Sequence, residues 1–182
     1  MDHPSFDKLI TAMGRETGIE VADTTPSDPT LIPALIEASK HSKPKNRARK
    51  ASWVLHHISD RHPQLMSPHI IELMDVLDES EDTSVYREIL KIFVDFKLST
   101  DQYESVKEPL YDLGIGLLYD DSLQKGLHYI AMRLVVRFNS TSEEKLQAIE
   151  SISELIARSS ANDKSLCNAA QRVLNKLKKS IS

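Results

Sequence analysis

RKASWVLHHI (residues 49–58) is the segment from which the fold can be inferred, because its apolar residues are spaced as on one face of an α-helix. The pattern returns as REILKIFVDF (87–96) and as KGLHYIAMRL (125–134), each offset from the last by 38 residues. A fourth copy, with Ala169, Val173 and Leu177, fits after an insertion of about four residues. Three sets of equivalent apolar positions are Ala51, Ile89 and Leu127; Leu55, Phe93 and Ala131; and Ile58, Phe96 and Leu134. The sequence therefore predicts a repeated helix with a buried apolar face.

Another helix is predicted before each copy. LIPALIEA (31–38) follows Thr30 as N-cap, and MSPHIIELM (66–74) has Ser67 as N-cap with Pro68 at the first helical position. Pro109 is expected to kink or restart the fifth helix. Glycine is scarce, at five residues, and nothing alternates as a strand does. We expect an all-α chain of eight helices, with antiparallel neighbours joined by short polar loops.

This two-helix unit resembles a HEAT repeat of the armadillo-type class. The resemblance is carried by LIPALIEA followed by RKASWVL, and by MSPHIIELM followed by DTSVYREILKIF (82–93). It covers roughly residues 26–180, and it implies one domain with a right-handed superhelical ARM-type fold, an α-solenoid of about four HEAT-like antiparallel helix pairs. Residues 1–25 lie outside the repeats, where SFDKLITAM (5–13) predicts a short capping helix followed by a flexible link.

The resemblance also implies that the second helix of each pair lines a concave surface. The polar arc of these helices carries basic and aromatic side chains, whereas acidic residues gather on the first helices. A basic inner wall in a protein of net charge −4 would attract an acidic peptide segment or a polyanion. The residues that we expect to bind a partner are Arg49, Trp53, His57, Arg87, Lys91, Tyr129 and Arg133.

For some of these residues, a structural role is the alternative to a binding role. The basic column formed by Arg49, Arg87 and Lys125 either contacts a ligand or pairs with acids in the adjoining turns. Trp53 is either an apolar anchor for a partner or a packing residue between neighbouring units.

The sequence nominates no catalytic residue, cofactor site or metal site. His56 and Asp60 are spaced to touch on one helix, but neither a nucleophile nor an oxyanion site accompanies them. The histidines do not form the metalloprotease pattern, and the glycines are too scattered for a phosphate loop. One cysteine, no signal peptide and no apolar run of about 18 residues predict a cytoplasmic protein without a membrane segment.

We therefore expect a non-catalytic protein-binding or scaffold module that uses a basic, aromatic-bearing concave face. The alternative is a DNA-binding protein similar to the HEAT-like alkylpurine DNA glycosylases, with Trp53, Asp60 and Asp95 in the functional roles. The net negative charge and the single tryptophan favour the first interpretation. The sequence leaves the partner's identity and the oligomeric state open.

Overall fold

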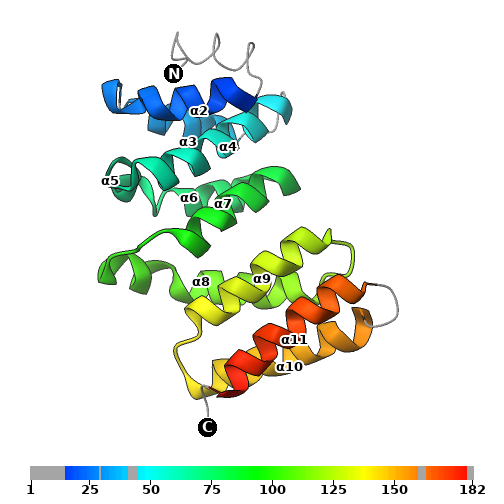
Figure 1. The fold of residues 1–182 in the computed structure, drawn as a ribbon. Coiled ribbons are helices and arrows are strands. Elements are labelled where there is room, and N and C mark those ends of the chain that lie inside the picture. The colour runs from blue at the N-terminus through cyan, green and yellow to red at the C-terminus, as the bar shows by residue number, and fades with distance from the viewer. Residues whose placement is uncertain (1–14, 29, 41–44, 160–162, 180–182) are drawn as a thin grey trace. The chain divides into compact units, whose positions relative to one another are not determined.

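The structure is a computed structural model that describes residues 15–28, 30–40, 45–159 and 163–179. Within these ranges every regular element is helical (Figure 1), which confirms the predicted all-α class. The capping helix expected at residues 5–13 lies outside the described residues. Part of the expected link up to residue 25 is helix α2 (Arg15–Thr24). None of the described helices combines the length and the apolar character that crossing a membrane requires.

The helices fall into two compact units, Met1–Gln102 and Tyr103–Ser182, and the boundary lies in the first turn of α8. After α2, the elements of the first unit are η1 (Thr25–Ser27), α3 (Leu31–Lys40), α4 (Lys45–Arg61), α5 (Pro63–Met66), η2 (Ser67–His69), α6 (Leu73–Glu79) and α7 (Thr83–Asp95). The second unit holds most of α8 (Thr100–Tyr119), then α9 (Lys125–Phe138), α10 (Ser142–Ser159) and α11 (Lys164–Lys179).

Two stacked helix pairs form the first unit. Helix α3 packs on α4 and α6 packs on α7, while the pairs meet through α3 against α6 and α4 against α7. Helix α2 covers another side of α4. The second helices of the two pairs, α4 and α7, therefore lie on each other. Leu55 of α4 and Phe93 of α7, which are equivalent in the sequence repeat, are both fully buried.

In the second unit, α9 contacts both α10 and α11, which pack along each other. Helix α8 approaches α9 closely at Gly114, where a Cβ atom would lie 2.8 Å from Val135 Cγ1. The glycine, a poor helix former in general, is thus needed for this packing. Helix α10 begins with a capping box in which the Glu144 N–H donates to Thr141 Oγ1 and the Thr141 N–H donates to the Glu144 carboxylate.

All nine apolar positions of the three aligned copies are buried, with at most 7% of any residue exposed. The periodicity of the sequence therefore located the core-facing side of α4, α7 and α9 correctly.

Two expected helix boundaries were wrong. Ser67 and Pro68 form the 3-10 turn η2, and α6 begins only at Leu73. The Gln102 side-chain amide donates to the Ser67 carbonyl at 2.7 Å, which holds this turn in place. Pro109 does not restart a helix, because α8 continues through it; the proline lies on the exposed side, where water can satisfy the carbonyl that it leaves without a donor.

Candidate functional site

The seven predicted binding residues belong to three helices of two units. Those of the first unit lie on α4 and α7, and those of the second unit lie on α9. The α4 residues are Arg49, Trp53 and His57, the α7 residues are Arg87 and Lys91, and the α9 residues are Tyr129 and Arg133.

A buried carboxylate, Glu88, organises the cations of α7. Only 5% of Glu88 is exposed, although it lies between two basic residues of the predicted face. Lys91 Nζ donates to both carboxylate oxygens at 3.0 Å, and Arg87 Nε donates to Oε1 at 3.1 Å. One negative charge thus holds two positive charges in fixed positions.

Helix α4 supplies a third donor to the same carboxylate. His56 Nδ1 lies 3.0 Å from Glu88 Oε2, and because an ionised carboxylate only accepts, the imidazole donates from Nδ1. On its other side, His56 Nε2 lies 3.7 Å from Asp60 Oδ2, which is the contact that the helical spacing predicted. His56 therefore ties α4 to α7 at the centre of the first unit.

These contacts keep Glu88 ionised. Burial alone would raise the pKa of Glu88, but the hydrogen bonds and positive charges of His56 and Lys91 outweigh burial and hold this pKa at about 2. The cations themselves reach solvent, with 43% of the Arg87 side chain and 33% of the Lys91 side chain exposed. We call Glu88 with His56, Arg87 and Lys91 the Glu88 cluster.

Arg49 of the basic column pairs with an acid of an adjoining turn, as the structural interpretation of this column expects. Its Nε donates to both oxygens of Asp82, at 2.9 and 3.1 Å, and Asp82 also accepts from the Ser84 N–H as the N-cap of α7. Burial would raise the pKa of Asp82, but the hydrogen bonds from Ser84 and Arg49 hold this pKa below its ordinary value. Nearly half of the Arg49 side chain, 46%, stays exposed.

The second unit repeats this arrangement. Lys125, at the start of α9, lies 3.6 Å from Asp163, whose carboxylate accepts from the N–H groups of Ser165 and Leu166 at the start of α11. In both units, a base in the first two turns of one second helix pairs with the acid that caps the next. Arg87, the third member of the column, is paired with Glu88 on its own helix.

Asp82→Ala should lower the free energy of unfolding by about 1.5 kcal/mol, because it removes the cap of α7 and the partner of Arg49 together. Asp82→Asn keeps a capping side chain and should cost less than half of this, since Arg49, whose side chain is 46% exposed, is solvated by water when Asp82 loses its charge. Urea unfolding of both variants measures the difference. Equal losses would show that the charge, and not the cap, stabilises this junction.

Trp53 packs against another helix of the first unit. A Cβ atom on Gly18 of α2 would lie 2.0 Å from Trp53 Cζ3, so the indole fills the space above that glycine. The indole and the ring of His57 form a T-shaped pair, with the ring centroids 4.4 Å apart and an angle of 84° between the planes. Burial, followed by the positive charge of His56, lowers the pKa of His57. The role of these two rings as anchors for a partner stays a prediction.

The α9 residues differ in their surroundings. The Tyr129 hydroxyl lies 3.2 Å from Ser165 Oγ at the start of α11, and Arg133 is exposed.

Sequence reasoning missed the residues that organise this surface, namely Glu88, Asp82 and Gly18. Glu88 carried one signal, because an acid three residues before Lys91 and next to Arg87 breaks an otherwise basic arc. Asp82 also carried one, since Asp is a preferred N-cap just before an apolar helix. Gly18 carried none, because its role depends on a tryptophan 35 residues away.

Within the described ranges, no group of three or more His, Cys, Asp or Glu side chains is placed to hold a metal ion. No protein-family model matches the chain, and comparison with curated proteins and with solved structures found no match either.

Proposed function

We propose that the chain is a non-catalytic binding module and that its first unit captures an acidic segment of a partner protein through Arg87 and Lys91. The Glu88 cluster is the observation that carries this proposal. Glu88 supplies one negative charge to two cations, so the pair presents a surplus of positive charge to solvent. The cations are already ordered, which lowers the entropy that binding would cost.

Arg49 extends the same face. It lies on α4, in the second turn, while Arg87 and Lys91 lie on α7, and these two helices pack on each other. Since the whole chain carries a net charge of −4, attraction of an acidic partner must come from a local surface of this kind.

We further propose that the helix pairs belong to a HEAT-like α-solenoid and that the protein works in the cytoplasm. Two features support the solenoid. Second helix stacks on second helix within each unit, and a base-to-cap ion pair joins the stacked helices in both, Arg49 to Asp82 and Lys125 to Asp163. The single cysteine supports a reducing compartment.

A titration with a fluorescent peptide rich in Asp and Glu tests the binding proposal. The double variant Arg87→Gln/Lys91→Gln should bind this peptide at least about tenfold more weakly than the unmodified chain. Raising the salt concentration should weaken binding by the unmodified chain and should affect the variant much less.

The matched control is Lys97→Gln/Lys176→Gln, which removes the same number of charges from exposed positions outside the cluster. Equal affinity of the two double variants would overturn the proposal. A DNA duplex of the same net charge, tested in parallel, identifies the alternative: tighter binding of DNA than of the peptide would make the protein a nucleic-acid binder.

A further inference from the structure

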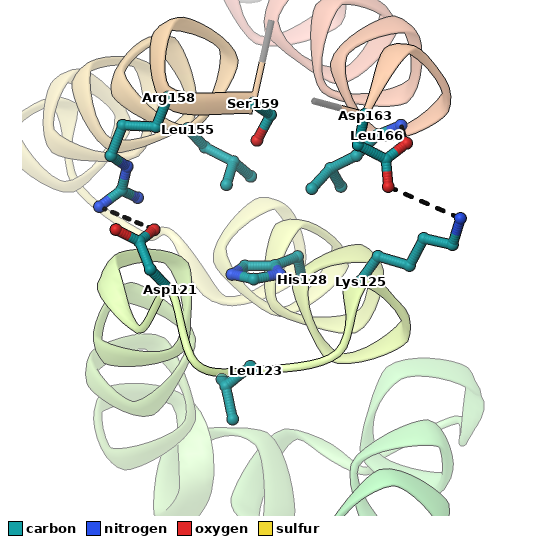
Figure 2. Close-up of a pocket in the computed structure, with 9 residues that line it drawn as sticks. All are labelled: Asp121, Leu123, Lys125, His128, Leu155, Arg158, Ser159, Asp163 and Leu166. Atoms are coloured by element: carbon teal, nitrogen blue, oxygen red, sulfur yellow. Dashed lines mark hydrogen bonds and ion pairs between the residues drawn. The ribbon is translucent and has the colours of Figure 1, made fainter. Parts of the chain in front are cut away.

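A pocket of about 460 Å³ lies within the second unit, between the start of α9 and the facing parts of α10 and α11 (Figure 2). Its volume is in the range that holds small molecules. Leucines provide apolar wall area, and charged residues lie on two sides. The lining residues are Asp121, Leu123, Lys125, His128, Leu155, Arg158, Ser159, Asp163 and Leu166.

Polar nitrogens without partners are concentrated at this pocket. His128 is 5% exposed, and neither Nδ1 nor Nε2 has a partner in full hydrogen-bonding geometry, although the ring makes a looser contact with the Asp120 carbonyl; Arg158 Nε has no partner in this geometry either. Leaving buried polar groups unpaired is costly, so such groups point to a ligand that would satisfy them. Burial lowers the pKa of His128, although the nearby Asp120 carbonyl opposes this in part. The neutral ring offers one donor and one acceptor.

One wall holds a fixed cation. The guanidinium of Arg158 donates from Nη2 to the Leu118 carbonyl at 2.7 Å, and it lies over the ring of Tyr119, 5.5 Å from the centroid. Its acidic partner Asp121, at 3.4 Å, is 69% exposed and can move away without breaking other described contacts. Arg158 is therefore placed to receive a negatively charged group.

The opposite wall holds a fixed anion. Asp163 Oδ1 accepts from the N–H groups of Ser165 and Leu166, both at 3.0 Å, and from the Ser165 hydroxyl at 2.8 Å, which anchors it at the start of α11. Oδ2 takes no part in this cap and lies 3.6 Å from Lys125 Nζ, whose side chain is 60% exposed. Asp163 can thus accept from a positively charged group.

Figure 2 shows the two ion pairs on opposite sides of the pocket, with the His128 ring between them. A ligand that suits this arrangement has opposite charges at its two ends, a hydrogen-bonding group in the middle and an apolar side. We propose that the pocket binds short peptides of two or three residues with both termini free. The carboxylate end lies at Arg158, the ammonium end at Asp163, and a central amide at His128, with an aliphatic side chain against Leu155 and Leu166.

Calorimetric titration of the full chain with the tripeptide Ala-Leu-Ala tests this proposal, which is independent of the acidic-segment surface. Binding is expected, and N-acetylation or C-amidation of the peptide should each weaken it at least about tenfold by removing one terminal charge. No binding up to about 10 mM, or equal affinity of either capped peptide, would overturn the proposal.

Two variants locate the site. Asp163→Asn retains a capping side chain but loses the charge, and it should weaken binding at least about tenfold. His128→Leu removes the unpaired nitrogens and should weaken binding by several-fold. The control Asp112→Asn, on the exposed side of α8 and outside the pocket, should bind like the unmodified chain. Unchanged affinity of Asp163→Asn, with its helical circular dichroism intact, would exclude this pocket as the site.

Discussion

Glu88→Ala is expected to lower the free energy of unfolding by about 3 kcal/mol, the largest loss among the variants considered for the first unit. The substitution removes a carboxylate that accepts from His56, Arg87 and Lys91 and leaves these donors without their shared acceptor. The loss falls at the lower end of the range for broken buried pairs, because Arg87 and Lys91 are partly exposed and water can solvate them. Urea unfolding at pH 7 measures it.

The stability that the Glu88 carboxylate contributes depends on pH, and the pKa of Glu88 determines the pH range in which it is lost. This pKa is about 2 in the folded chain against an ordinary value of 4.5. Because the folded-state pKa is the lower one, the carboxylate stabilises the fold above pH 4.5, and this contribution disappears as the pH falls from 4.5 towards 2. The difference in stability between the unmodified chain and Glu88→Gln should shrink across that window.

Glu81→Ala is the control, since Glu81 is an exposed acid of the first unit. It should change the free energy of unfolding by no more than about 0.5 kcal/mol. If Glu88→Ala costs no more than Glu81→Ala, the buried carboxylate does not organise the first unit.

Gly18→Ala should lower the free energy of unfolding by about 2 kcal/mol. The new methyl group would lie 2.0 Å from Trp53 Cζ3 and 2.8 Å from Cε3, so α2 or the indole must move. The ring of His57 against the indole restricts that movement. The higher helix propensity of alanine offsets the loss only in part, by up to about 1 kcal/mol.

A double-mutant cycle with Trp53→Leu tests this explanation. If the clash is the cause, the combined variant Gly18→Ala/Trp53→Leu is less destabilised than the sum of the two single variants. Additive losses would contradict it. Gly116→Ala provides the matched control, because nothing lies within 4 Å of a Cβ atom there, and this change should stabilise α8 by up to about 1 kcal/mol.

The sequence was sufficient to predict the all-helical class and the buried sides of α4, α7 and α9, but not the number of helices: eight were expected, and α2 and α5 were not among them. Helical spacing of apolar residues is a local property, and burial of Leu55, Phe93 and Ala131 follows from it directly. Boundaries were harder to predict when they depended on distant residues. The turn at Ser67 and Pro68 is held by Gln102, which lies 35 residues further along the chain.

The candidate site was predicted only in part. The basic arc predicted Arg87 and Lys91, but not Glu88, the buried carboxylate that fixes them. Whether a charged residue is buried depends on its partners, and one partner of Glu88 is His56 on a neighbouring helix. Trp53 was assigned to the arc by its helical position, while its packing depends on the absence of a side chain at Gly18. Residue types on one helix face do not reveal what the facing helix contributes.

The pKa of Glu88, measured from the shift of its side-chain carboxyl carbon in an NMR titration of the folded chain, tests the central claim most directly. The account predicts that the carboxylate stays ionised down to a midpoint near pH 2, because three donors hold it in the charged form. A midpoint near the ordinary value of 4.5 would show that Glu88 is not engaged by His56, Arg87 and Lys91. In that case the ordered pair of cations, and with it the proposed surface for an acidic partner, would not exist.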